Sequence, residues 1–232
     1  MSRLASKLFA SRTRALWVLS PLCLGCGSER ASFFPGALSD GFCEACAPSL
    51  LTTEDPRGPE KITCVQYGGA VEVLVSRIKH GQRPDLCAPW ARACAPEIAR
   101  KLELVIPDGM QSVDCIVPVP AHPLHAWSRG FDAAHLVAVA LGTYFQRPLA
   151  TNLLRRSAWT ASQKLLPRSK RQLNATSGFY DTGRRAPPNV LLVDDVCTTG
   201  ATLRACRSLL LASGAVFVAS LALAERVRHD LP

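Results

Sequence analysis

The sequence predicts an α/β fold in which a mainly parallel, twisted sheet is flanked by helices and preceded by a small N-terminal module. Three observations lead to this prediction. Apolar runs of strand length alternate with longer segments whose apolar residues recur at helical spacing. The chain has 232 residues, of which 48% are hydrophobic, so it can bury one substantial core. Two closely spaced cysteine pairs lie near the N-terminus.

Residues 1–22 carry basic side chains followed by a short apolar stretch. We expect an amphipathic lead-in here rather than a signal peptide, because no small-residue cleavage site follows the stretch. The stretch is also shorter than a bilayer requires, and no other apolar run approaches that length. The sequence therefore predicts no membrane span.

Residues 23–50 hold the paired cysteines, Cys23 with Cys26 and Cys43 with Cys46. Two cysteines three positions apart on a tight turn can direct both thiolates at one ion, and two such turns complete a tetrahedral shell. We therefore expect a zinc ribbon whose zinc is structural, with a redox pair or incidental thiols as the alternative. The other six cysteines are scattered, which is typical of reduced thiols and predicts a cytoplasmic protein.

Residues 51–61 are polar, contain two prolines and a glycine, and predict a linker to a domain over residues 62–232. That domain opens with a predicted strand, glycine turn and helix over residues 62–81. A second helix is expected over residues 89–103, with an interruption near Pro96.

The rest of this domain follows the same alternation. A strand is predicted over residues 114–120 and a long helix over residues 131–145. Residues 151–189 are mostly polar and give few core signals. The final segment predicts a strand at 190–193, a loop, a helix at 202–213 and a strand at 216–223, which together favour a mainly parallel sheet.

The loop after the 190–193 strand combines Asp194 and Asp195 with two threonines and a glycine. A loop that enters a helix presents unpaired main-chain N–H groups and the positive end of the helix dipole, which suit a phosphate. Because carboxylates repel phosphate, the two acids are expected to contact sugar hydroxyls or a magnesium ion. A phosphate beside vicinal hydroxyls describes a ribose 5-phosphate. A strand end capped by Asp, with threonines in a turn, is the structural alternative.

Residues 190–203, VLLVDDVCTTGATL, resemble the phosphoribosyl pyrophosphate motif of type I phosphoribosyltransferases. Within that superfamily the chain is similar to the ComF family, which is named for a competence protein involved in DNA uptake. The similarity includes the VPVP strand and Arg-Gly-Phe segment within residues 116–141, and the segments 155–179 and 67–81. The paired cysteines match the zinc-ribbon module of that family.

The resemblance implies roles for individual residues. Asp194 and Asp195 would hold the ribose hydroxyls, and Arg129 would face the pyrophosphate with its planar fork of donors. These three are our candidate catalytic residues. The candidate substrate-binding residues are Lys79, Gln163 and Arg171, together with the phosphate loop of Cys197, Thr198, Thr199, Gly200, Ala201 and Thr202. The chain departs from the family at Asp132 and Ala133, where Asn-Gln is usual.

Two functions follow from the resemblance. In the first, the protein binds phosphoribosyl pyrophosphate with magnesium and transfers the phosphoribosyl group to an unknown nitrogen nucleophile, in a process linked to DNA uptake. In the second, it is a non-catalytic competence factor that binds single-stranded DNA or competence proteins and uses the site as a ligand sensor. The net charge of +9 fits an anionic partner in either case. We expect Trp127 and Trp159 to pack in the core or under a lid, with base stacking as the alternative.

Overall fold

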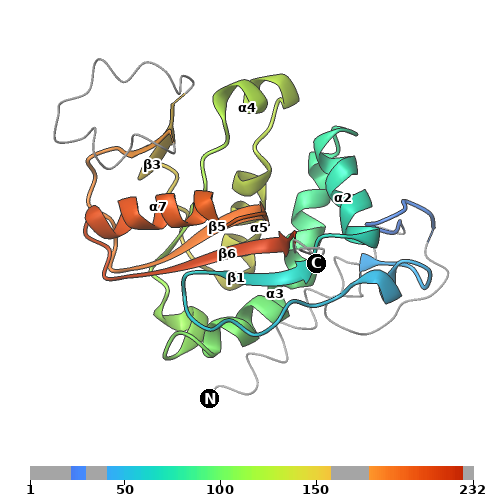
Figure 1. Ribbon diagram of the computed structural model, residues 1–232, viewed down its shortest axis with the longest axis horizontal. Coiled ribbons are helices and arrows are strands. Elements are labelled where there is room, and N and C mark those ends of the chain that lie inside the picture. The colour runs from blue at the N-terminus through green and yellow to red at the C-terminus, as the bar shows by residue number, and fades with distance from the viewer. Residues whose placement is uncertain (1–21, 30–40, 158–177, 227–232) are drawn as a thin grey trace, which may run out of the picture.

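In the computed structural model, which describes residues 22–29, 41–157 and 178–226, four strands form one parallel sheet in the order β1-β6-β5-β2 (Figure 1). The predicted α/β class is confirmed, because helices flank this sheet and the four cysteines lie together before it. The strands are β1 (Ile62–Gln66), β2 (Cys115–Pro118), β5 (Asn189–Cys197) and β6 (Phe217–Glu225).

Helices cover both faces of the sheet, and alternate residues of β5 face one side or the other. Leu191 and Val193 pack in a core with α2, α3 and α5, whereas Val190 and Leu192 pack in a second core with α7. Each buried Leu or Val stabilises the fold by roughly 1.5–3 kcal/mol relative to an exposed one. The α-helices are α2 (Gly69–Lys79), α3 (Cys87–Glu103), α4 (Pro123–Arg129), α5 (Ala133–Phe145) and α7 (Ala201–Ala212), and the 3-10 helices are η2 (Ala47–Ser49), η3 (Pro84–Leu86) and η4 (Gly109–Ser112).

The last strand–helix–strand unit matches the sequence prediction closely, but β5 is longer than expected. It continues past Val193 to Cys197, because β6 offers pairing partners as far as Glu225, opposite Cys197. Asp194 and Asp195 therefore lie in the strand, and the loop before α7 is limited to residues 198–200.

The predicted interruption near Pro96 is wrong, since α3 runs unbroken through this residue. A proline inside a helix removes one main-chain hydrogen bond and crowds the preceding turn. Here Cys94, Ala95 and Ile98 around it are almost fully buried in the core. Their packing offsets the local cost and keeps the helix intact.

The polar region 151–189 contains an antiparallel ribbon that the sequence did not predict. Its strands are β3 (Leu154–Arg156) and β4 (Phe179–Asp181), and Leu154 and Phe179 bury their side chains. The guanidinium of Arg156 stacks 4.7 Å from the centre of the Phe179 ring. Three residues singled out in the sequence, Trp159, Gln163 and Arg171, lie outside the described residues.

Short segments pair with both outer strands of the sheet. Thr52 bridges to Val65 of β1 in antiparallel fashion, and Leu149 bridges to Ile116 of β2 in parallel. The 51–61 segment is thus attached to the domain that it was predicted to link. Among the described helices, none is both long and apolar enough to cross a membrane.

A fully buried lysine holds this segment in place. Lys101 Nζ donates to the main-chain oxygens of Thr53 at 2.8 Å, Glu54 at 2.9 Å and Thr63 at 2.8 Å, and it lies 2.8 Å from Thr53 Oγ1. Glu97 Oε1 lies 3.6 Å from the same nitrogen. A buried ammonium is tolerated only when its donors are satisfied, and here these oxygens satisfy them.

Candidate functional site

The predicted ligand residues lie at the carboxyl edge of the parallel sheet. β5 brings Asp194 and Asp195 to this edge, and residues 198–200 connect it to α7. β1 ends at the same edge and leads through Tyr67 and Gly68 into α2. In open α/β sheets, ligands bind outside the carboxyl ends of the strands. The topology therefore gathers the acids and the threonine loop where such a ligand would lie.

The loop before α7 has the geometry of an anion-binding turn. Gly200 adopts φ +71°, and a Cβ there would approach Arg204 Nη1 to 3.0 Å, so the position favours glycine. Arg204 Nη1 also donates to Thr199 O at 2.9 Å, which fixes the turn. Within the described residues, the main-chain N–H groups of Thr198, Thr199 and Thr202 donate no hydrogen bond. They are the unpaired donors expected at a helix N-terminus.

Asp194 and Asp195 point to opposite faces of the sheet, as neighbours in a strand must. Asp195 is buried and faces α2, where Lys79 Nζ lies 2.6 Å from its Oδ2. Asp194 faces α7. Burial raises the pKa of the Cys206 thiol on that helix, and the negative charge of Asp194 raises it further. The Asp195 N–H donates to Asp194 Oδ1 at 2.9 Å and ties the two together.

The two carboxyl groups differ in their electrostatic surroundings. Desolvation, followed by repulsion from Asp195, raises the pKa of Asp194 well above its usual value, although the residue keeps partial exposure. Asp195 instead has the Lys79 ammonium as its counter-ion. The site therefore combines one neutralised carboxylate with one carboxyl group that holds its proton more strongly than usual.

Arg129 lies at the end of α4, which follows β2 at the same edge. Within the described residues, no hydrogen bond or ion pair joins it to either aspartate. Asp132, which departs from the usual family sequence, has a structural role. Its Oδ1 caps α5 by accepting from His135 N at 3.2 Å, and its Oδ2 accepts from Ala121 N at 3.1 Å. This residue holds the loop after β2 against α5.

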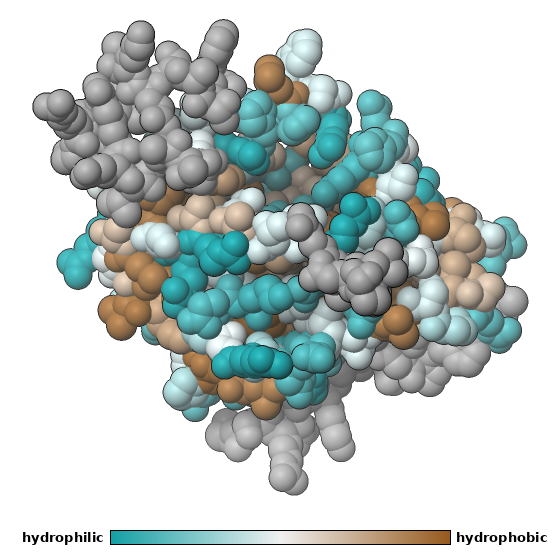
Figure 2. Space-filling model, in the orientation of Figure 1, coloured by the Kyte–Doolittle hydropathy of each residue, from teal (hydrophilic) through white to brown (hydrophobic). Residues whose placement is uncertain are grey.

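The expectation that Trp127 packs in the core is wrong. Its side chain is 85% exposed, and Leu124 on the same short helix is 62% exposed. The face of the molecule in Figure 2 is mostly hydrophilic, with hydrophobic side chains in separate patches. α4 thus displays an aromatic ring to solvent near the carboxyl edge.

The four paired cysteines form one cluster whose sulfur atoms all lie within 4.8 Å of one another. Cys26 Sγ is 3.7 Å from Cys43 Sγ. A tetrahedral zinc with bonds of about 2.3 Å places its sulfurs about 3.8 Å apart, so the cluster fits a metal ion such as zinc.

The protonation of these thiols is uneven. Hydrogen bonds from Ser28 lower the pKa of Cys26 to about 6, whereas burial raises the pKa of Cys46 to about 12. Because metals bind thiolates, binding at this cluster would release protons.

Comparison with known proteins supports the resemblance seen in the sequence. The chain is 26% identical over 206 residues to the DNA utilization protein YhgH of Escherichia coli (strain K12), covering 89% of this chain and 85% of that protein. It is 27% identical over 206 residues to YhgH of Salmonella typhimurium, covering 87% and 88%. It is 26% identical over 199 residues to Competence protein F of Haemophilus influenzae, covering 82% and 83%.

The resemblance to the ComF family is confirmed. No family model matches the chain. Of the residues that carry the ComF resemblance, Lys79, Asp195 and the 198–200 loop meet at the sheet edge, and the four cysteines meet at a separate cluster.

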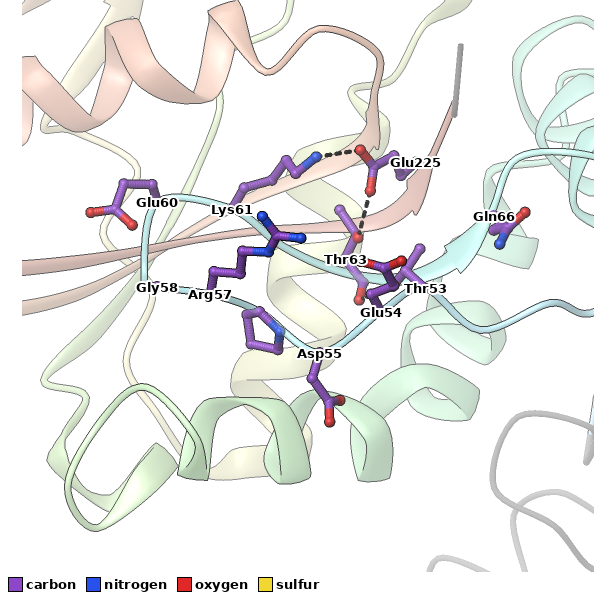
Figure 3. Close-up of a pocket in the computed structure, with 11 residues that line it drawn as sticks. Thr53, Glu54, Asp55, Arg57, Gly58, Glu60, Lys61, Thr63, Gln66 and Glu225 are labelled. Carbon is purple, nitrogen blue, oxygen red and sulfur yellow. Dashed lines mark hydrogen bonds and ion pairs between the residues drawn. The ribbon is translucent and has the colours of Figure 1, made fainter. Parts of the chain in front are cut away.

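One cavity of the protein lies outside the residues that carry the resemblance to the ComF family (Figure 3). It has a volume of about 580 Å³ and is bounded by the 53–61 segment and by side chains of β1 and β6. Lys61 forms an ion pair with Glu225 on its wall, and Thr63 Oγ1 donates to Glu225 Oε2 at 3.0 Å. Sequence reasoning missed this cavity because the segment that closes it was predicted to be a linker.

Proposed function

We propose that this protein binds phosphoribosyl pyrophosphate, or a related ribose phosphate, with magnesium at the carboxyl end of β5, and that it acts in DNA uptake or utilization. The observation that carries the proposal is the Lys79–Asp195 ion pair at the sheet edge, where the 198–200 loop that follows Asp195 in the chain has unpaired N–H groups. The names of the relatives, DNA utilization protein and Competence protein F, support the biological role.

In this proposal the 5′-phosphate lies against the 198–202 turn. The free N–H groups and the dipole of α7 favour an anion there, and Gly200 leaves the main chain uncovered by a side chain. The hydroxyls of Thr198 and Thr199, both exposed, add donors. These donors make the loop suited to bind a small dianion such as a phosphate group.

The ribose hydroxyls then lie against the aspartates. Because Lys79 already neutralises Asp195, that carboxylate is better suited to accept hydrogen bonds from hydroxyls than to bind a cation directly. Asp194 is partly exposed, and its carboxyl oxygens can accept hydrogen bonds from a second hydroxyl. Magnesium would arrive with the pyrophosphate and take oxygen ligands from it and from water.

The transfer reaction breaks the bond between the anomeric carbon and the pyrophosphate oxygen and forms a bond to a nitrogen nucleophile, which loses a proton. Negative charge grows on the leaving group, so cations placed near it stabilise the transition state. Arg129 is the candidate for this role on α4, with Arg171 and Gln163 as further substrate-binding candidates.

The proposal is tested with the double variant Asp194→Asn, Asp195→Asn. Both changes preserve side-chain size, so we expect a folded protein whose binding of phosphoribosyl pyrophosphate and magnesium, measured by calorimetry, is abolished. Asp108→Asn is the matched control, since Asp108 is exposed and lies before the amino end of β2, at the opposite edge. Unchanged affinity in the double variant would refute the site.

A second function, binding of single-stranded DNA without turnover, is favoured by the exposed Trp127 and by the net charge of +9. We expect such binding to weaken steeply with salt and to be reduced by Trp127→Ala. Pyrophosphate release in a screen of nucleobases distinguishes the two functions, because only the enzyme releases it.

The proposal also includes a structural zinc at the cysteine cluster and a cytoplasmic location. The location rests on the six cysteines outside the cluster, which are scattered along the sequence and not spaced as a disulfide framework. The cluster and the sheet edge would then serve different purposes, one holding the fold and the other the ligand.

A further inference from the structure

One helix, α2, contacts both the cysteine cluster and the ligand site. At its start, Ala70 N donates to Ser49 Oγ at 3.0 Å, and this hydroxyl donates to Cys46 O at 2.8 Å. The first turn of α2 is thereby attached to the second cysteine pair. Figure 1 shows residues 22–29, coloured blue, beside the same helix.

The last turn of α2 holds the first cysteine pair through Arg77. One guanidinium nitrogen, Nη1, lies 3.1 Å from Cys23 O and 2.8 Å from both Leu24 O and Gly25 O. These carbonyls belong to the turn that joins Cys23 to Cys26. A Cβ at Gly27, which has φ +82°, would come within 3.0 Å of Arg77 Nη2, so the turn and the guanidinium are closely fitted.

Two residues further along, Lys79 forms the ion pair with Asp195. Between the two attachments, Val71, Leu74, Val75 and Ile78 bury the apolar face of α2 in the core. Arg77 and Lys79 share one helical turn, so the backbone that fixes one side chain also fixes the other. Hydrogen bonds made by a charged donor are stronger than neutral ones, which makes Arg77 a firm anchor.

We propose that Arg77 is a positioning residue, which couples the metal state of the cysteine cluster to the placement of Lys79 against Asp195. A metal ion fixes the Cys23–Cys26 turn, the turn fixes Arg77 through three carbonyls, and Arg77 fixes the last turn of α2. Loss of the metal or of the guanidinium then frees Lys79 from Asp195. The consequence for ligand affinity rests on the proposed function, whereas the consequence for Lys79 itself does not.

The first experiment measures the reactivity of the Lys79 amine in the zinc-loaded full chain. Limited acetylation with acetic anhydride, read by mass spectrometry, reports how freely each lysine leaves its partner. We expect Arg77→Met to raise Lys79 labelling about fivefold, the lower end of typical coupling between sites. Lys61, whose side chain is 50% exposed and paired with Glu225, is the internal reference and keeps its wild-type labelling.

Two further variants make this result specific. Arg83→Met removes an exposed arginine that pairs with Asp85 just beyond α2, and should leave Lys79 labelling unchanged. Arg77→Lys keeps the charge but lacks the planar fork, so it gives an intermediate value and serves if Arg77→Met does not fold. Equal Lys79 labelling in wild type and in the folded Arg77 variants overturns the proposal.

The second experiment uses linkage between metal and ligand. If the two sites are coupled, phosphoribosyl pyrophosphate with magnesium must slow zinc release to a zinc-selective chromophoric chelator, because coupling is reciprocal. We expect about fivefold slowing in wild type and none in Arg77→Met, with the ligand at a concentration that calorimetry shows to saturate both proteins. Absence of ligand binding to wild type would refute the proposed function alone, and the labelling experiment still decides the role of Arg77. Binding with equal slowing in both proteins refutes the coupling.

Discussion

Lys79 at the end of α2 and Asp195 near the end of β5 form an ion pair of 2.6 Å between Nζ and Oδ2. The two residues are far apart in the sequence, and each was selected there for a separate reason. In the structure they define the charge of the site, because the carboxylate is buried and the ammonium is its counter-ion.

Removing only one partner of this pair should cost more stability than removing both. In Lys79→Met the buried Asp195 lacks its counter-ion, and we expect a loss of about 2 kcal/mol, somewhat less than for a fully buried pair. Lys79→Met combined with Asp195→Asn should recover at least half of that loss. Urea unfolding gives the free energy of unfolding of the two single variants and the double variant. A loss in the double variant equal to the sum of the two single losses would contradict the prediction.

Asp194→Asn should stabilise the fold at neutral pH. The pKa of Asp194 is raised in the folded state from an ordinary value of 3.8, so its ionisation opposes folding once the pH exceeds that value. The advantage of the variant is therefore absent near pH 4 and grows as the pH rises. Thermal unfolding at pH 5 and pH 8 measures it, and a difference that does not change with pH would argue against this account.

The cysteine cluster should bind one zinc per chain. Metal analysis of protein purified without chelator measures the content, and Cys43→Ser should lose the metal and lower Tm. Cys115→Ala is the control, since Cys115 is buried in β2 outside the cluster, and should retain the zinc. Wild-type protein that is purified without chelator, contains no metal and has the same Tm as Cys43→Ser would disprove the site.

Lys101→Met should be strongly destabilising, by about 3 kcal/mol. It leaves the part-buried main-chain oxygens of Thr53 and Glu54 without a donor, and Thr63 O keeps only the donor from Thr53 Oγ1. The neighbouring Arg100→Met is the matched control. Arg100 is exposed, its ion pairs with Asp55 and Glu97 lie at the surface, and its removal should cost less than about 1 kcal/mol. Denaturant unfolding compares the two, and similar losses would show that Lys101 does not hold the 53–54 segment.

Arg129→Ala should weaken binding of pyrophosphate more than binding of ribose 5-phosphate. The guanidinium is expected to face the leaving group and not the sugar phosphate. Calorimetry with each ligand separately gives the ratio of the Kd of the variant to that of wild type for pyrophosphate and for ribose 5-phosphate. Equal losses would mean that the contact of Arg129 is assigned to the wrong part of the substrate.

Elements specified by local pattern were predicted well. The apolar run before Asp194 and the helical spacing after Gly200 both gave the correct element within a few residues. Features that depend on distant partners were not. β5 is longer than its apolar run because β6 pairs with it, and the short β3 and β4 become strands only by pairing with each other.

The same distinction applies to the site. The acids, the threonine loop and the cysteine cluster follow from residue type and spacing. The opposite directions of Asp194 and Asp195, the pairing of Lys79, and the contacts of Arg77 depend on how α2 packs against the sheet. No pattern in the sequence distinguishes Arg77 from the other arginines, so its contacts appear only in the folded chain.

The bridges from Thr52 to β1 and from Leu149 to β2 have a consequence for the behaviour of the protein at high concentration. Exposed strand edges attract strands of other molecules and lead to aggregation. In the described part of this sheet, each outer strand already carries a short neighbour from its own chain, so intermolecular sheet growth is blocked at both ends.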